Sequence, residues 1–168
     1  VWQCRRTAAF CEGLKKRGLE PKLQDKTGLV ADAYFSASKM KWLLQNKGQV
    51  FNAAKSGKLA MGTMDSWLIY QLTGGLSFVT EPSNASRTQL MDITLGQWDE
   101  ELVDLFAVPE DSLPHILNSA DFFGECVLPG LKGVPIYGVL GDQQSSLFGH
   151  GCFKKGEAKN TYGTGAFM

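Results

Sequence analysis

The chain has 168 residues, the length of about one domain, which is enough to bury a substantial core. Seventeen basic residues balance seventeen acidic ones, so the formal net charge is zero and does not indicate nucleic acid or an anionic membrane as a partner. Hydrophobic residues make up 43% of the chain and charged residues 20%, which is typical of a globular protein in solution.

Four helices are predicted in the first two thirds of the chain, from apolar residues at helical spacing. They cover residues 6–18, 34–46, 63–75 and 97–106. Ser36 or Ser38 is expected to cap the second helix. In the third helix, Trp67, Leu68 and Leu72 are expected to face the core.

Strand candidates follow a turn that the prolines predict at residues 109–114. They cover residues 124–128, 134–140 and 156–168, where β-forming residues lie between Gly and Pro. The last segment contains Gly163-Thr164-Gly165, a two-glycine turn that predicts a β-hairpin. Helices mixed with strands, without internal repeats, predict an α/β protein.

The four cysteines, Cys4, Cys11, Cys126 and Cys152, are widely spread and form no Cys-x-x-Cys pair of the kind used by zinc or redox sites. Reduced thiols and no metal-binding residues are therefore predicted. No apolar run is as long as a membrane span, and no stretch resembles a signal peptide. These features predict a protein of the reducing cytoplasm.

Asp142 lies where the strand predicted at 134–140 gives way to an amphipathic segment. Asp at such a position can cap a helix, because its side chain accepts hydrogen bonds from the N–H groups of the first turn. It can also act in catalysis, because open α/β sheets place their chemistry at the carboxyl ends of strands. The residues alone leave both interpretations open.

The turn at Gly163-Thr164-Gly165 also allows two interpretations. Glycine can serve there only to permit a positive φ, or the bare backbone N–H groups and the Thr164 hydroxyl can hold a phosphate. A phosphate-binding turn together with Asp142 would suit phosphoryl transfer, in which a carboxylate orients or deprotonates the attacking hydroxyl. Neither motif is a Walker loop or a protein-kinase glycine loop, so another kinase architecture is required.

The whole chain resembles the members of the FGGY family of carbohydrate kinases that phosphorylate glycerol. The resemblance rests on six segments in order: "VWQCRRTA", "TGLVADAYFSASKMKWLLQN", "GTMDSWLIYQLTGG", "SNASRTQLMDI", "GDQQSSLFG" and "AKNTYGTGAFM". It implies the α/β, actin-like ATPase (ribonuclease H-like) fold, in which two domains close around a cleft. Residues 1–152 would form the later part of the first domain, and residues 153–168 the opening β-hairpin of the second, ATP-binding domain. The chain is thus expected to be a fragment of a longer kinase.

The resemblance assigns roles to individual residues. Asp142 matches the catalytic base, which takes the proton of the attacking substrate hydroxyl, and it also contacts the substrate. Gln143 matches a glycerol contact beside it, and Tyr34 matches a tyrosine that hydrogen-bonds the polyol. Trp2 and Phe167 match the apolar walls that pack against the glycerol carbon chain. From the residues alone, each of these three aromatic side chains could equally belong to the core.

Gly163 and Thr164 match the loop that holds the ADP phosphates. The implied reaction transfers a phosphoryl group from ATP, bound with Mg²⁺, to glycerol, and the intact protein is expected to be a homo-oligomer. Two alternatives stay open: a family kinase for another sugar or polyol, and a non-catalytic kinase-like fragment that acts as a binding module. The segment "WQCRRT" favours glycerol, because sugar kinases of the family often carry an acidic residue near the position of Cys4.

Overall fold

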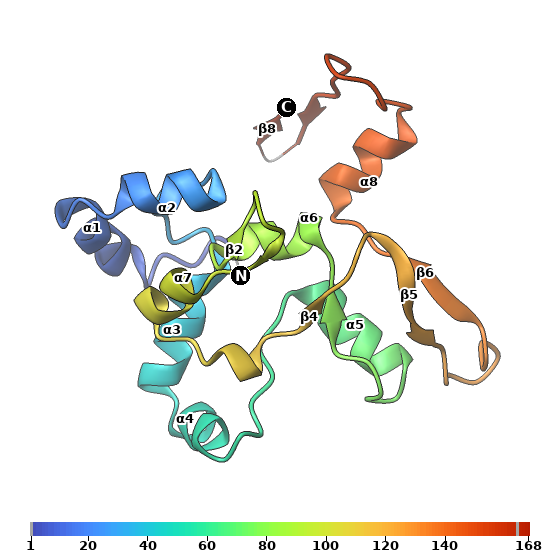
Figure 1. Cartoon of the computed structure of the whole chain (residues 1–168), viewed down its shortest axis with the longest axis horizontal. Helices are drawn as coiled ribbons and strands as arrows, with labels where there is room; N and C mark the ends of the chain where they lie inside the picture. Colours follow the sequence, from blue (N-terminus) through green and yellow to red (C-terminus); the bar gives the residue numbers. More distant parts are fainter. Residues whose placement is uncertain (1, 164) are drawn as a thin grey trace.

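The computed structural model describes residues 2–163 and 165–168, with most helices in the first two thirds of the chain (Figure 1). The α-helices are α1 (Ala8–Lys16), α2 (Glu20–Thr27), α3 (Ser36–Asn46), α4 (Gly48–Lys55), α5 (Met64–Leu72), α6 (Pro82–Ala85), α7 (Glu100–Phe106) and α8 (Asp142–Gly149). Two short 3₁₀ helices are η1 (Ser86–Thr88) and η2 (Glu110–Ser112).

The strands form two-stranded sheets. They are β1 (Val79–Thr80), β2 (Met91–Asp92), β3 (Gln97–Trp98), β4 (His115–Ile116), β5 (Ala120–Glu125), β6 (Pro135–Gly138), β7 (Thr161–Tyr162) and β8 (Ala166–Phe167). β1 pairs with β4 in parallel, and the pairs β2–β3, β5–β6 and β7–β8 are antiparallel. The β5–β6 register shifts between Ala120 and Gly124.

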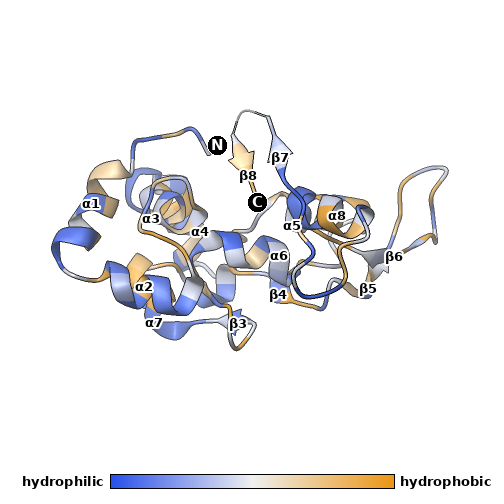
Figure 2. Ribbon diagram, turned by 90° about the horizontal axis from the view of Figure 1, so that it is seen from above, coloured by the Kyte–Doolittle hydropathy of each residue, from blue (hydrophilic) through white to orange (hydrophobic). Residues whose placement is uncertain are grey.

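The larger hydrophobic core lies among α1, α2, α3 and α7. Leu14, Leu23, Met40, Leu102 and Phe106 are buried in it. These helices carry hydrophilic and hydrophobic residues in alternation along their length (Figure 2), as expected where one face of a helix packs and the other meets water. A smaller core under α5 and β5 contains Ile69, Val79 and Phe123.

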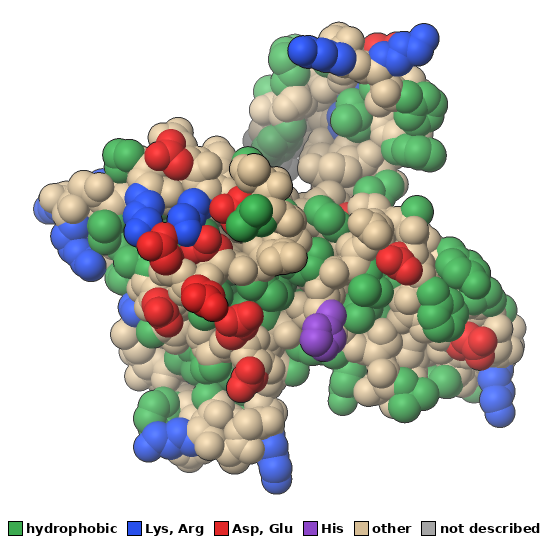
Figure 3. Space-filling model, viewed as in Figure 1, with side chains coloured by type: hydrophobic (Ala, Val, Ile, Leu, Met, Phe, Trp, Pro, Cys, Tyr) green, Lys and Arg blue, Asp and Glu red, His purple; other side chains and the backbone are tan. Residues whose placement is uncertain are grey.

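An ion-pair cluster on the surface joins α2 to α7. Lys22 and Lys26 approach Glu101 at 2.9 and 2.6 Å, and Lys26 also pairs with Asp99. The acidic and basic side chains gather visibly over these two helices (Figure 3). Hydrogen bonds from Lys26 and Lys22 lower the pKa of Glu101 to about 2.

Three predicted helices are confirmed with shorter bounds, as α1, α3 and α5, and the turn at 109–114 contains η2. The fourth is confirmed in part, because β3 occupies Gln97–Trp98 and α7 begins at Glu100. The predicted cap of α3 is wrong. Phe35 holds the N-cap position, Ser36 is already helical, and the buried Ser38 hydroxyl lies 2.8 Å from that of Thr7.

The predicted orientation of α5 is also wrong. Trp67 and Leu68 are 55% and 48% exposed, and the helix buries Ser66 and Ile69 instead. The reason lies on the opposite stripe of the helix, where Asp65 accepts a hydrogen bond of 2.7 Å from the buried Thr80 of β1. That polar contact turns the Ile69 side of α5 toward the sheet.

The late strands are confirmed in kind and shifted in position. The segment predicted at 124–128 starts earlier, as β5, and that at 134–140 is shorter, as β6. The predicted C-terminal hairpin forms as β7–β8. Together with α8 it extends away from the rest of the chain (Figure 1). Within the described residues, no helix combines the length and apolar character needed to cross a membrane.

Candidate active site

Asp142 is the first residue of α8, and the position that caps this helix belongs to Gly141. The Asp142 carboxylate accepts a 2.8 Å hydrogen bond from the backbone N–H of Gln143, its immediate neighbour, and makes no capping bond further into the helix. The side chain is exposed. Asp142 therefore does not cap the helix with its side chain, as the capping interpretation required. Its carboxylate is accessible to a ligand.

Gln143 connects α8 to the C-terminal hairpin. Its side-chain oxygen accepts hydrogen bonds from Lys159 Nζ at 2.8 Å and from the Thr161 hydroxyl, at the start of β7, at 3.2 Å. The predicted substrate contact is thus also the residue that holds the hairpin against the first turn of α8.

Trp2, at the start of the segment that precedes α1, and Tyr34, in the loop that precedes α3, lie side by side. Their ring centroids are 5.8 Å apart, and the rings are inclined by 52°. Trp2 is 51% exposed and Tyr34 40% exposed, so neither is a core aromatic. The buried partner in this group is Phe35, whose ring meets that of Tyr34 edge-on at 5.1 Å.

The loop that carries Tyr34 is held by charged side chains from both directions. Asp32 accepts a 2.7 Å hydrogen bond from the Tyr34 backbone N–H. Lys39, one turn into α3, donates to the carbonyl oxygens of Ala33, Tyr34 and Phe35, the last two at 2.9 and 3.0 Å. An ammonium group has three N–H donors, and these three carbonyls engage all of them. Burial lowers the pKa of Lys39.

Phe167 lies on β8 and is partly exposed, so the core interpretation is wrong for this ring too. Gly163, directly after β7, donates its N–H to the Gly165 carbonyl at 2.9 Å. A Cβ at Gly165 would lie 2.9 Å from the Phe167 ring, so glycine there lets the ring pack on the backbone. Thr164, the other predicted phosphate contact, lies outside the described residues.

The predicted site residues therefore fall into two groups. The first group consists of Trp2 and Tyr34. The second consists of Asp142 and Gln143 on α8 and Phe167 on the hairpin. Among the described residues, no hydrogen bond or ring contact joins the two groups. In the view from above, the start of the chain projects near β8 (Figure 2), but Figure 1 shows that the hairpin lies well above it.

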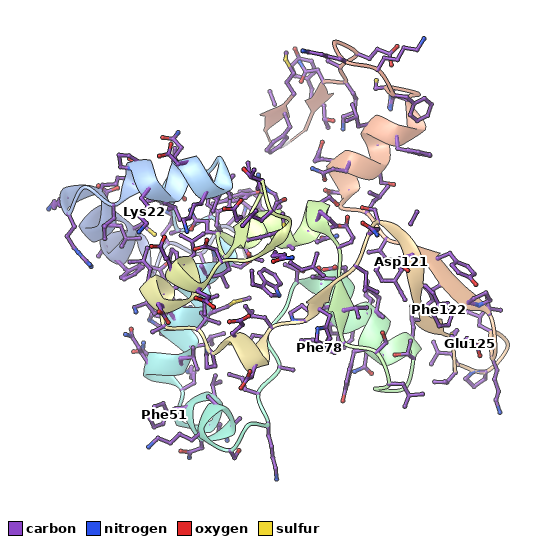
Figure 4. All side chains as sticks on the ribbon, in the orientation of Figure 1. Lys22, Phe51, Phe78, Asp121, Phe122 and Glu125 are labelled. Carbon is purple, nitrogen blue, oxygen red and sulfur yellow. The ribbon has the colours of Figure 1, made fainter. Side chains whose placement is uncertain are left out.

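Two surface grooves lie elsewhere and contain none of these residues. One, of about 490 Å³, lies between the end of α5 and β5–β6 and is lined by Phe122 and Glu125 among others. The second, of about 530 Å³, is lined by Phe78, Trp98 and His115. Figure 4 labels Phe122 and Glu125 on β5 and Phe78 near β4, away from α8.

The supporting contacts that the sequence did not predict are those of Lys39 with the loop of Tyr34, of Lys159 with Gln143, and of the Ser83 hydroxyl with the Gly141 N–H. Lys39 had a local signal, since a lysine five residues after Tyr34 in a helix can reach the preceding loop. Lys159 and the Gly141 contacts depend on tertiary structure, and no spacing in the sequence indicated them.

Known proteins that are similar to this chain all point to one family. The sequence model described as "FGGY family of carbohydrate kinases, N-terminal domain" matches residues 1–149. The glycerol kinase of Polaromonas sp. strain JS666 is 54% identical over all of this chain and 34% of its own length. That of Aeromonas hydrophila is 51% identical with the same coverage. The chain thus spans about a third of the length of these curated relatives.

Solved structures give the same result. The glycerol kinase of Plasmodium falciparum with ADP superposes with a TM-score of 0.94 and 38% identity, over 99% of this chain and 33% of that one. The xylulose kinase of Lactobacillus acidophilus, at 22% identity, matches 89% of this chain and 30% of its own with a TM-score of 0.76, which indicates the fold alone. The predicted α/β, actin-like fold is therefore confirmed.

Proposed function

The chain belongs to the FGGY family of carbohydrate kinases, and on that premise we propose that the natural polypeptide containing it phosphorylates glycerol with ATP. The products are glycerol 3-phosphate and ADP. The observation that carries the proposal is the exposed Asp142 carboxylate at the start of α8, tied through Gln143 to the hairpin that bears Phe167. The glycerol kinases similar to this chain over its whole length support the choice of substrate.

Asp142 is the general base in this proposal. As the glycerol hydroxyl oxygen attacks the γ-phosphorus, its proton passes to the Asp142 carboxylate. The new O–P bond forms while the bond between that phosphorus and the bridging oxygen of ADP breaks. The exposure of the carboxylate at the helix N-terminus leaves room for a hydroxyl to reach it.

Glycerol binding would draw on both groups of residues. The Trp2 and Tyr34 rings and the Phe167 ring supply apolar walls for the carbon chain, and the Tyr34 hydroxyl supplies a hydrogen bond. Because the carbonyl oxygen of Gln143 already accepts from Lys159 and Thr161, its amide N–H groups are the ones to meet a polyol oxygen. A site built from such partners rejects ligands that leave its polar groups unpaired.

Gly163 and Thr164 would hold the nucleotide phosphates. The proposal that ATP is the phosphate donor depends partly on this role of the two residues. Mg²⁺ would accompany ATP and neutralise phosphate charge. Among residues 2–163 and 165–168 there is no group of three or more His, Cys, Asp or Glu side chains placed to hold a metal.

We further propose that the protein acts in the cytoplasm and as a homo-oligomer. The division into residues 1–152 and 153–168 as parts of two domains also stays a prediction. It is supported by the way the chain extends outward through α8 into the hairpin (Figure 1).

The test is a substrate panel on the natural polypeptide, with ADP release measured for glycerol, pentoses and hexoses. We expect kcat/KM for glycerol to exceed that for every sugar by roughly a hundredfold or more, because a misfit ligand leaves polar groups of the site unpaired. A preference for a pentose or hexose would replace glycerol with that sugar. Turnover of none of them, in a folded protein that still binds a panel member, would favour the binding-module alternative.

A further inference from the structure

Glu81 is a fully buried carboxylate, with a relative exposure of 0%, directly after β1 at the N-cap of α6. It accepts five hydrogen bonds: from the backbone N–H groups of Ser83 and Asn84, the side chains of the same two residues, and the Ser119 hydroxyl, at 2.5–3.0 Å. Capping a four-residue helix requires only the two backbone bonds. The three side-chain bonds therefore need another explanation.

Two of the residues that bind Glu81 also hold the segment that leads into α8, Ser83 with its side chain and Ser119 with its backbone carbonyl. The Ser83 hydroxyl, which donates to Glu81 at 2.5 Å, accepts a 2.8 Å hydrogen bond from the Gly141 N–H. Ser119 donates its hydroxyl to Glu81 at 2.6 Å, and its carbonyl accepts from the Val139 N–H at 3.1 Å. One buried carboxylate thus organises both contacts to the turn that immediately precedes the proposed base.

The identity of Gly141 fits this arrangement. Its φ of −60° and ψ of 151° are open to any residue, so its conformation does not require glycine. A Cβ at this position would lie 3.3 Å from the Ser83 hydroxyl oxygen and 2.8 Å from Oε1 of Gln144. The flexible Gln144 side chain can move, but Ser83 is held by Glu81. Glycine therefore lets the hydroxyl approach closely, and a Cβ would displace it by a few tenths of an ångström.

The direction of the Ser83 hydroxyl depends on the charge of Glu81. A hydroxyl has one proton to donate, and donation to the carboxylate leaves the oxygen lone pairs for the Gly141 N–H. Burial disfavours a charge on Glu81, yet the hydrogen bonds from Ser119, Ser83 and Asn84 outweigh it and hold the pKa below its ordinary value. The carboxylate is thus ionised, and charge-assisted bonds of this kind are strong.

We propose that Glu81 is a positioning residue that acts through Ser83 and Ser119 to fix the turn carrying Asp142, and that it supports the rate of phosphoryl transfer and not the affinity for glycerol. This inference rests on the function proposed above. Its physical basis is that a base displaced by about 1 Å can lose up to two orders of magnitude in rate.

The test is Ser83→Ala in the natural polypeptide, which removes the acceptor for Gly141. We expect kcat to fall by about tenfold with KM for glycerol within about twofold of wild type. Ser83→Thr retains the hydroxyl and should restore kcat to within about threefold. Ser86→Ala is the matched control, because its hydroxyl donates to the Ser83 carbonyl at 3.3 Å and does not contact the turn. A wild-type kcat in Ser83→Ala overturns the proposal.

Hydrogen–deuterium exchange at the Gly141 amide provides a readout that needs no activity. Ser83→Ala should speed exchange at this amide by about tenfold or more and leave the amide of Leu117, which donates to Thr80, unchanged. Equal exchange of Gly141 in both proteins overturns the link to Ser83. If the wild type phosphorylates no substrate, the proposed function fails, and the exchange result alone decides whether the network fixes this turn.

Discussion

Replacing Asp142 by Asn in the natural polypeptide removes the proton acceptor and almost nothing else. The amide oxygen of Asn can still accept the 2.8 Å hydrogen bond from the Gln143 N–H, and the side chain keeps its shape. Loss of a general base costs roughly two to four orders of magnitude in rate. We therefore expect kcat for glycerol-dependent ADP release to fall by about 10²–10⁴.

The effect of this substitution on stability should be small. Asp142 is exposed and occupies the first helical position, so the change removes only the interaction of a charge with the helix N-terminus, about 0.3–1 kcal/mol. Asp99 is the control, because it caps α7 through a 3.0 Å bond from the Leu102 N–H. Asp99→Ala removes this cap together with the ion pair to Lys26, so it should cost about 1 kcal/mol or more and leave kcat unchanged. The reasoning is refuted if Asp142→Asn retains kcat within a few-fold of wild type.

Four further predictions follow from other parts of the molecule. Thr164→Val should weaken ATP binding, measured by calorimetry, about tenfold, because a hydrogen bond to a charged group contributes about 1.5 kcal/mol or more. An unchanged ATP affinity with a lower melting temperature would show that Thr164 has only a structural role in the turn. Lys39→Met removes the donors to three loop carbonyls and should raise KM for glycerol about tenfold by loosening Tyr34, and an unaltered KM would contradict this. The pKa of Glu81 lies below its ordinary value of 4.5, so the stability that its ionised form contributes is complete above pH 4.5 and is lost as pH falls through the folded-state pKa. The free energy of unfolding of Glu81→Gln, measured with denaturant, should therefore decrease less steeply with falling pH than that of wild type. Equal pH dependence of the two proteins would contradict this. The 168-residue chain alone should show no glycerol-dependent ADP release. It should also self-associate, as measured by light scattering, because Trp67 and Leu76 are among many exposed apolar side chains. An active, monodisperse monomer would refute both expectations.

Apolar residues at helical spacing indicated α1, α3 and α5, even though these helices bury only a few of their side chains. α2 and α4 were not predicted. In α2 the only buried apolar side chain is Leu23, and the helix depends on an early Pro and on Gly28 in the left-handed conformation. α4 buries no residue and begins with Gly. The face of α5 could not be predicted either, because the buried Thr80 that binds Asp65 is fifteen positions away.

The sequence allowed the residues of the candidate site to be predicted, but not the hydrogen bonds that hold them in place. Asp142, Gln143 and Tyr34 stand in motifs that the family resemblance covers, and these remain predictions of role. The contacts of Glu81 with Ser119 and of Ser83 with Gly141 span 38 and 58 positions. Nothing in the local sequence distinguishes a glutamate that caps one short helix from one that also organises a distant turn.

The parallel pairing of β1 with β4 has a consequence for the order in which the chain folds. The ladder is two residue pairs long, Val79 with His115 and Thr80 with Ile116, and α6, β2, β3 and α7 lie between its strands. Closing a loop of that length costs chain entropy that so short a ladder cannot offset. The intervening helices must therefore collapse first, and non-local pairings of this kind form late. Glu81 follows β1 directly, so we expect its carboxylate to be enclosed only near the end of folding, when the turn that precedes Asp142 acquires its final geometry.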